Sequence, residues 1–144
     1  MTSQIAVIAQ SSGEQLNILG TVMVVKLDAD GVFVAENVVP PGCGAPLHVH
    51  DAEDEIFSIL EGELTLISEA GETKARPGDT VWLPRGVPHG FRNATEQTVR
   101  ALVFANPGAR IAAMFRQFDR ACSLGPVVPE RIGAICAEHG VHFQ

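Results

Sequence analysis

The chain has 144 residues and a formal net charge of −7, with 46% hydrophobic and 19% charged residues. This length suits one domain with a core of its own, and the composition argues against disorder over most of the chain. Because the chain is acidic and no stretch concentrates Lys or Arg, we expect neither nucleic acid nor a membrane surface as a partner.

The first apolar run, from Ile5 to Ala9, has no basic residues before it. A run of this length is too short for a signal peptide or a membrane span, so we expect a cytoplasmic protein. The cysteines, Cys43, Cys122 and Cys136, lack C-x-x-C spacing. We therefore expect free thiols rather than a disulfide framework or a zinc ribbon.

Most of the chain reads as short strands between turn signals. Runs rich in β-branched residues at 21–27 and 31–39 predict two strands separated by the turn sequence DADG. The alternating run 55–67 has Gly62 in its middle and predicts a hairpin, because glycine tolerates a positive φ. Further strands are predicted within 70–93 and at 99–105. About eight short strands at this spacing are typical of a sandwich or small barrel, so we predict an all-β fold.

After residue 107 the hydrophobic period becomes helical. The apolar positions that predict a first short helix are Ile111, Met114, Phe115 and Phe118. A second short helix is expected to begin near Pro129 and to end before Gly140. We expect the two helices to cover one side of the barrel; the alternative is a lid over its mouth.

These patterns predict three parts. Residues 1–20 form an N-terminal arm, residues 21–107 form the β-barrel domain, and residues 108–144 form a C-terminal helical segment.

Three histidines and one glutamate are candidates for a metal site. His48 and His50 are two positions apart on an extended stretch, so both imidazoles point to the same face, about 6.6 Å apart. Glu55 opens the next strand, where a buried carboxylate needs a compensating charge. His89 follows a Pro-Arg-Gly turn that can return the chain to this pair. The set suits one divalent transition metal ion (Ni, Mn, Fe, Co, Cu or Zn) with two positions open.

The neighbouring polar residues are interpreted differently. Asp51, Glu53 and Asp54 read as a solvated turn, because a polar connection between two strands explains them. His139 and His142 lie beside a helix-ending glycine and near the last residue, and we expect no catalytic role for them.

The sequence resembles the cupin superfamily, in the single-domain form, because both motifs of that family are complete. The first motif, G-x5-H-x-H-x4-E-x6-G, contains Gly42, His48, His50, Glu55 and Gly62. The second motif, G-x5-P-x-G-x2-H-x3-N, contains Gly78, Pro84, Gly86, His89 and Asn93. Beyond the motifs, stretches such as LGTVMVVK and EDEIF are similar to the quercetin dioxygenase-like branch.

The resemblance implies a cupin β-barrel or jelly roll whose metal ion is bound by His48, His50, Glu55 and His89. It also implies a homodimer. In flavonol dioxygenases of this type, the metal-bound glutamate acts as the base toward a substrate hydroxyl, a role that would fall to Glu55, and dioxygen is the second substrate. Candidate aromatic lining residues for a flat ligand are Phe57, Phe91 and Trp82, although the interpretation of each as an ordinary core residue is favoured.

Two other functions fit the same motifs. One is a metal-dependent isomerase, decarboxylase or oxidase of a small acid or sugar; an acid would need a cation beside the metal, for which Arg85 and Arg92 are candidates. The other is a non-catalytic cupin that binds a small molecule or a metal. Thiol dioxygenation is less favoured, because such cupins usually lack the carboxylate ligand that Glu55 provides.

Overall fold

The computed structural model describes residues 4–29 and 31–144. Residues 1–3 of the expected N-terminal arm, and Asp30 in the expected turn between the first two strands, lie outside the described residues. Within the described ranges, neither helix combines the length and the apolar character that crossing a membrane requires.

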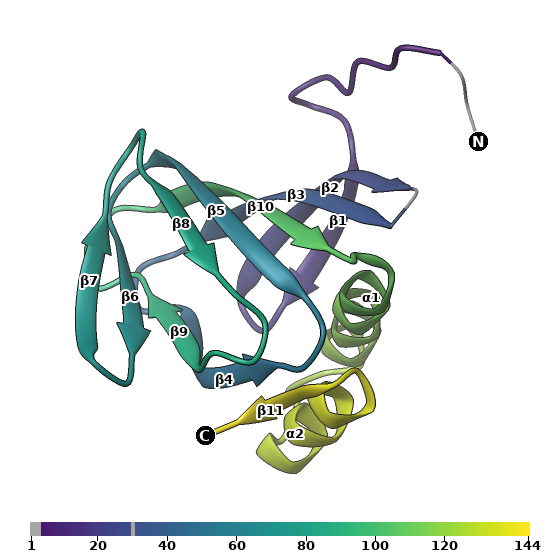
Figure 1. Cartoon of the computed structure of the whole chain (residues 1–144). Helices are drawn as coiled ribbons and strands as arrows, with labels where there is room; N and C mark the ends of the chain where they lie inside the picture. Colours follow the sequence, from purple (N-terminus) through teal and green to yellow (C-terminus); the bar gives the residue numbers. More distant parts are fainter. Residues whose placement is uncertain (1–3, 30) are drawn as a thin grey trace.

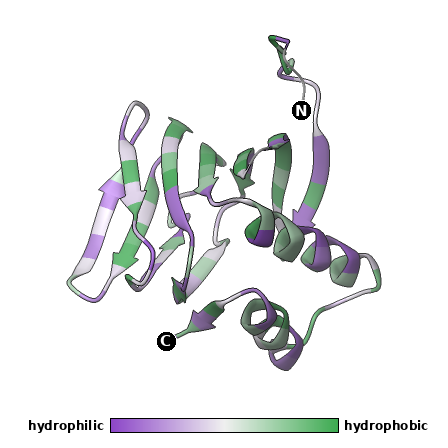
Figure 2. Cartoon of the chain, turned by 45° about the vertical axis from the view of Figure 1, so that its right-hand side comes forward, coloured by the Kyte–Doolittle hydropathy of each residue, from purple (hydrophilic) through white to green (hydrophobic). Residues whose placement is uncertain are grey.

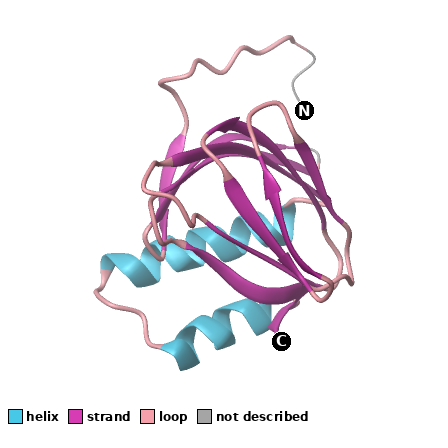
Figure 3. Cartoon of the chain, turned by 90° about the vertical axis from the view of Figure 1, so that its left-hand side faces the viewer, coloured by secondary structure: helices cyan, strands magenta, loops and turns pink. Residues whose placement is uncertain are grey.

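Two antiparallel sheets face each other and form the body of the molecule (Figures 1 and 3). The six-stranded sheet has the spatial order β1 (Glu14–Ile18), β2 (Thr21–Ala29), β3 (Val32–Val39), β10 (Val99–Asn106), β5 (Asp54–Glu61) and β8 (Thr80–Leu83). The five-stranded sheet has the order β11 (Val141–Phe143), β4 (Gly44–His50), β9 (His89–Arg92), β6 (Leu64–Ser68) and β7 (Gly71–Ala75). The prediction of an all-β jelly roll with two C-terminal helices is confirmed.

The predicted hairpin across 55–67 is wrong. The turn at Gly62 has the expected positive φ of 78°. However, β5 pairs with β10 and β8, whereas β6 pairs with β7 and β9. The turn therefore carries the chain from one sheet to the other. Sequence alternation alone does not distinguish such a crossing from a hairpin, because both need two strands and a turn.

Both flanking segments contribute a strand that the sequence did not indicate. β1, inside the expected arm 1–20, pairs with β2 along its whole length. β11, at the end of the helical segment 108–144, pairs with β4 beside the histidines. The sheets thus extend past both limits of the expected barrel domain 21–107, and residues 4–13, before β1, project away from the barrel (Figure 1).

Buried and more exposed residues alternate along β2, β3 and β10, which gives the six-stranded sheet a buried face and an outer face. Figure 2 shows bands of hydrophobic and hydrophilic residues along the strands. On the outer face a continuous row of apolar residues crosses five strands: Leu27, Val34, Phe104, Ile56 and Trp82. Trp82 ends this row and is 69% exposed. The suggestion that Trp82 lines the barrel interior is therefore wrong, since the register places it on the opposite face.

The helices α1 (Ala109–Ser123) and α2 (Pro129–Glu138) lie together on one side of the barrel (Figure 3). α1 packs against β1, β2 and β3, and α2 packs against α1 and β11. The buried residues of α1 are Ile111, Ala112, Met114 and Phe118, which matches the predicted apolar stripe. Together with β1–β3 they form one of the two hydrophobic clusters, while the other fills the barrel between β5, β6 and β10.

Candidate metal centre

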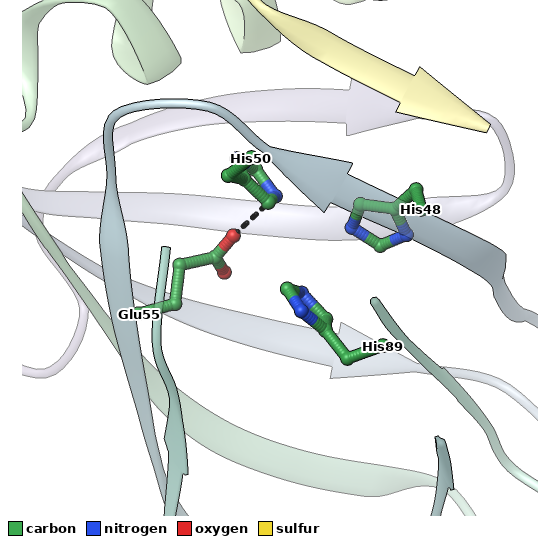
Figure 4. A group of neighbouring side chains, drawn as sticks. All are labelled: His48, His50, Glu55 and His89. Carbon is green, nitrogen blue, oxygen red and sulfur yellow. Dashed lines mark ion pairs between the residues drawn. The ribbon is translucent and has the colours of Figure 1, made fainter. Parts of the chain in front are cut away.

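The structure brings the four side chains singled out by their spacing into one buried cluster. The possible ligand atoms of His48, His50, Glu55 and His89 all lie within 4.8 Å of one another, and all four residues are buried. Figure 4 shows the three imidazoles and the carboxylate converging on one point. The five-stranded sheet supplies the histidines and the six-stranded sheet supplies the glutamate, so the cluster joins the two sheets.

The local sequence of β4 explains how both of its histidines reach the interior of the barrel. His48 and His50 occupy alternate buried positions of β4. The pairing of β4 with β9 is irregular between Ala45 and His48, where Pro46 lacks the N–H that a regular ladder needs. Gly44 permits the close approach of β9, because a Cβ there would collide with the backbone around Phe91.

His89 is brought to the pair by the turn between β8 and β9. Gly86, with φ of 76°, donates its N–H to the His50 carbonyl at 2.8 Å, which ties this turn to the end of β4. His89 then lies directly opposite His48 in the β4–β9 register. As predicted, the Pro-Arg-Gly turn returns the chain to the first two histidines, because Gly86 adopts a positive φ.

Glu55 reaches the cluster from β5, where it occupies an inward position opposite Ala105 and Leu83. Its Oε1 lies 2.6 Å from His50 Nε2. Burial acts to raise the pKa of Glu55, but the hydrogen bond from His50 and the nearby imidazoles lower it, so the carboxyl is ionised at neutral pH. A buried carboxylate held in its charged form is the electrostatic partner that a cation needs.

The three histidines have different proton affinities. Burial lowers the pKa of His48 to about 4, and burial also lowers the pKa of His89. Burial acts to lower the pKa of His50 as well, but the carboxylates of Glu53 and Glu55 outweigh it and raise that pKa to about 9. Two of the three imidazoles are therefore already neutral at pH 7, which is the form that binds a metal.

The geometry fits a divalent transition metal ion. Ligands at about 2.1 Å from an octahedral ion lie about 3 Å apart when adjacent and about 4.2 Å apart when opposite. The spread of 4.8 Å within the cluster needs only small side-chain movements to reach such an arrangement. Nitrogen and carboxylate oxygen donors without a thiolate accept several first-row ions, and the role of each residue as a ligand stays a prediction.

Glu53 is not part of a solvated turn, which corrects the interpretation of the acidic stretch. Its side chain is 1% exposed, and it accepts a hydrogen bond from Arg110 Nε at 3.0 Å. Its second oxygen, Oε2, lies 3.7 Å from His50 Nδ1. The acidic run DAEDE gave no reason to separate Glu53 from its neighbours, because its partner Arg110 lies in α1, far along the chain.

The other two acidic neighbours match the interpretation as surface residues. Asp51 is exposed and lies 3.0 Å from His142 Nε2, also at the surface. Asp54 forms an ion pair with Arg85 at 3.0 Å, and the hydrogen bonds from Arg85 lower the pKa of the Asp54 carboxyl. Neither pair contacts the buried cluster.

A cavity of about 380 Å³ opens from the cluster and is lined mainly by apolar side chains. Phe57 and Phe91 both line it, with ring centroids 5.6 Å apart in an edge-to-face arrangement. The helices form another wall through Met114, Phe115, Phe118, Ile132 and Cys136. They thus cover one side of the barrel, as expected, and supply part of the cavity lining; a lid role stays a prediction. Burial raises the pKa of Cys136 to about 11, which leaves an unreactive thiol there.

The expected cation for an acidic substrate does not reach this cavity. Arg85 is paired with Asp54, and Arg92 is paired with Glu72 at 2.6 Å. Among the described residues, those that line the cavity include neither Lys nor Arg. Arg85 and Arg92 are therefore surface residues, and the cavity offers an anion no counter-charge besides a metal ion.

The two facing antiparallel sheets, with three histidines and a glutamate between them, define a class of β-barrel with a candidate metal site inside. Residues 36–105 match the family model Cupin_2, a cupin domain. The solved polyketide cyclase RemF of Streptomyces resistomycificus is similar, with a TM-score of 0.63 and 29% identity, over 72% of this chain and 80% of that one. The chain therefore contains a cupin domain over these residues, and its likeness to RemF extends beyond them.

Similar curated proteins share part of their length with this chain. An uncharacterized protein of Methanocaldococcus jannaschii is 37% identical over 76 residues, which cover 51% of this chain and 59% of that protein. The quercetin 2,3-dioxygenase of Bacillus subtilis is 26% identical over 110 residues, covering 76% of this chain and 30% of the dioxygenase. The chain spans between about a third and three fifths of the length of these relatives.

Metal affinity should fall as the pH falls from about 9. An ion must displace the proton of His50, whose pKa is about 9, so each pH unit below that value should weaken binding about tenfold. His48, with a pKa of about 4, is neutral over this range and adds no further loss. Titrations with Zn²⁺ between about pH 8 and pH 6 measure the slope. An affinity that is constant over this range would contradict the raised pKa of His50.

Proposed function

We propose that the protein is a metal-dependent dioxygenase of a flavonol-like or other small aromatic hydroxy compound. The observation that carries this proposal is the buried cluster of three histidines and one glutamate at the wall of a largely apolar cavity. A volume of about 380 Å³ lies in the range of small-molecule sites. The partial likeness to a quercetin 2,3-dioxygenase supports the same reaction class.

In this proposal Glu55 is the catalytic base. A divalent ion bound at the cluster would acidify a hydroxyl of the ligand. The Glu55 carboxylate is ionised, buried and at the cavity wall, so it is placed to take the proton of that hydroxyl. Phe57 and Phe91 would hold the flat ring by edge and face contacts, and the apolar walls would exclude water.

The alternative functions differ in the ligand they require. A metal-dependent isomerase, decarboxylase or oxidase of a small acid needs a counter-charge for the carboxylate, and the described lining of the cavity provides none beyond the metal site. A neutral aromatic compound suits these walls better. A cupin that binds such a compound without turnover remains the second candidate, because the same cavity would serve it.

One buried polar side chain extends the proposed ligand chemistry. Asn37 is 6% exposed, lines the cavity, and its Oδ1 has no hydrogen-bond partner. In the sheet register it lies in the row of Ala101 and Ile59, four positions along β5 from Glu55, or about 13 Å along the strands. A ligand that satisfies Asn37 would carry a hydrogen-bond donor at the end away from its metal-binding oxygens.

We expect Asn37→Leu to reverse a ligand preference. Among flavonols with and without a hydroxyl on the ring away from the chelating oxygens, the variant should bind the hydroxylated form about tenfold more weakly, because one hydrogen bond is lost. The form without that hydroxyl should bind at least as tightly as before. Calorimetry with the metal-loaded protein measures both. Equal losses for the two ligands would contradict a contact at Asn37.

A screen of metals and substrates tests the proposed function. Oxygen uptake would be followed with a panel of flavonols and simple aromatic hydroxy compounds, with Mn, Fe, Co, Ni, Cu or Zn added in turn to metal-free protein. We expect uptake with at least one metal and a product that contains both oxygen atoms. Tight ligand binding without uptake under any metal would favour the binding protein, and turnover without oxygen uptake would favour the isomerase or decarboxylase class.

The native metal, the homodimer and the cytoplasmic location stay predictions. The metal screen addresses the first, and the molar mass of the purified protein in solution addresses the second.

A further inference from the structure

The three histidines of the cluster differ in the hydrogen-bond partner of Nδ1, the ring nitrogen that does not bind the ion when Nε2 does. Nδ1 of His48 lies 2.8 Å from the Pro46 carbonyl, and Nδ1 of His89 lies 3.1 Å from the Val87 carbonyl. Each carbonyl is two residues earlier in the chain and keeps a proton on Nδ1. His50 Nδ1 instead is buried without a hydrogen-bond partner.

The group that faces His50 Nδ1 is the carboxylate of Glu53. Its Oε2 lies 3.7 Å from that nitrogen and is itself buried without a hydrogen-bond partner. Two unsatisfied buried atoms, one a possible donor and the other an acceptor, thus face each other just beyond hydrogen-bond distance. Because an unpaired buried polar atom is costly, such a pair calls for an explanation.

The other oxygen of Glu53 is held by Arg110, in the first turn of α1. Arg110 Nε donates to Glu53 Oε1 at 3.0 Å. The guanidinium passes close to Gly140, between α2 and β11, where a Cβ would lie 2.6 Å from Nη2. The Gly140 carbonyl accepts the N–H of Asp51 at 2.9 Å. The start of α1, the end of α2 and the loop after His50 therefore meet at one junction.

We propose that Glu53, held in place by Arg110, is a positioning residue that keeps the proton of His50 on Nδ1 and directs Nε2 to the metal ion. Through the ion pair of Glu53 with Arg110, helix α1 outside the barrel influences how strongly His50 binds the metal ion inside it. The inference rests on the metal site proposed above. It concerns Glu53 and Arg110, neither of which is a ligand in that proposal.

The geometry favours this role. His50 Nε2 and Glu55 Oε1 lie 2.6 Å apart, closer than the roughly 3 Å between adjacent ligands of one ion. Binding of both to one ion requires the two atoms to separate by about 0.4 Å, and a shift of about 0.7 Å would bring His50 Nδ1 and Glu53 Oε2, 3.7 Å apart, within hydrogen-bond distance. Carboxylates that accept the second N–H of a ligand histidine typically change metal affinity 10- to 100-fold.

The adjacent carboxylate supplies a matched control. Asp54 is also paired with an arginine, Arg85, at the same distance of 3.0 Å, but this pair lies at the surface away from the cluster. We expect Glu53→Leu and Arg110→Met to weaken Zn²⁺ binding after correction for the proton that the ion displaces from His50, the first by about 10- to 100-fold and the second by less. Asp54→Asn and Arg85→Met should leave the affinity unchanged. Competition with a chromophoric chelator measures all four dissociation constants.

A spectroscopic measurement separates positioning from a general loss of stability. In Zn²⁺-loaded protein labelled with ¹⁵N at histidine, His50 should show a protonated, slowly exchanging Nδ1. Glu53→Leu should lose the slow exchange at His50 only, while His48 and His89 keep theirs through their backbone carbonyls. Glu53→Gln, which retains an acceptor oxygen, should recover part of both the signal and the affinity.

The outcomes distinguish this inference from the proposed function. Wild-type protein that binds no Zn²⁺ would overturn the metal site and the inference with it. Tight binding by the wild type, with affinity and His50 signal unchanged in both Glu53→Leu and Arg110→Met, would overturn the inference alone. If Glu53→Leu fails to fold, Arg110→Met still decides, because Arg110 is 42% exposed and its removal leaves no cavity in the core.

Discussion

His48→Ala and His89→Ala should each lower the metal content of the purified protein well below that of the wild type. The two histidines lie directly opposite each other in the β4–β9 register, and each substitution removes one nitrogen donor of the cluster. Two imidazoles and one carboxylate remain and can still hold an ion, but the loss of one nitrogen donor should lower the affinity, so that metal is lost during purification. Elemental analysis of protein purified in parallel with the wild type measures the bound metal.

The controls for this experiment are His139→Ala and His142→Ala. His139 Nδ1 is bound to the Ile135 carbonyl at 2.8 Å, and His142 pairs with Asp51 at the surface. Both variants should keep the wild-type stoichiometry. Unchanged metal content in His48→Ala and His89→Ala would mean that the ion, if any, binds elsewhere.

Glu55→Gln should lower kcat for the substrate found in the screen by about 10²- to 10⁴-fold, the usual contribution of a general base. The amide keeps the size of the side chain but cannot take a proton. Because the three histidines remain, the variant can be saturated with metal, and the rate is measured only after saturation has been confirmed. The observable is oxygen uptake at saturating substrate.

Asp54→Asn, next in sequence, is the control for Glu55→Gln, since Asp54 contacts Arg85 and not the cluster. Its rate should match the wild type. A Glu55→Gln variant that retains full kcat would exclude Glu55 as the base and leave it, at most, as a metal ligand.

The residues of the cluster could be predicted from sequence because their placement depends on local geometry. Alternation along one strand puts His48 and His50 on the same face, and the turn at Gly86 returns His89 to them. Glu55 was identified by its position at a strand start. The role of Glu53 could not be predicted in this way, since its burial depends on Arg110, which is 57 residues further along the chain.

The errors in the fold have a common origin in strand pairing. The run 55–67 does contain two strands and a glycine turn, but β5 and β6 belong to different sheets. Likewise, the sequence alone does not tell whether Trp82, an aromatic residue in a strand, lies in the interior or at the surface. Its pairing with Ile56 places it on the outer face of the sheet. Pairing is set by long-range packing, which local propensity does not determine.

The burial of Asn37, in contrast, could have been predicted from the sequence. In VFVAENVV the buried positions of β3 are Phe33, Ala35, Asn37 and Val39, so alternation alone puts an amide among apolar side chains. A polar residue at such a position needs a partner and is therefore a candidate for ligand contact.

The most direct measurement of the metal centre is a crystal structure of the Mn²⁺-loaded protein with data collected to record anomalous scattering. We predict one anomalous peak between the sheets, about 2.0–2.2 Å from Nε2 of His48, His50 and His89 and from a Glu55 oxygen. No peak at the cluster under saturating metal, with His50 and Glu55 still hydrogen-bonded to each other, would contradict it.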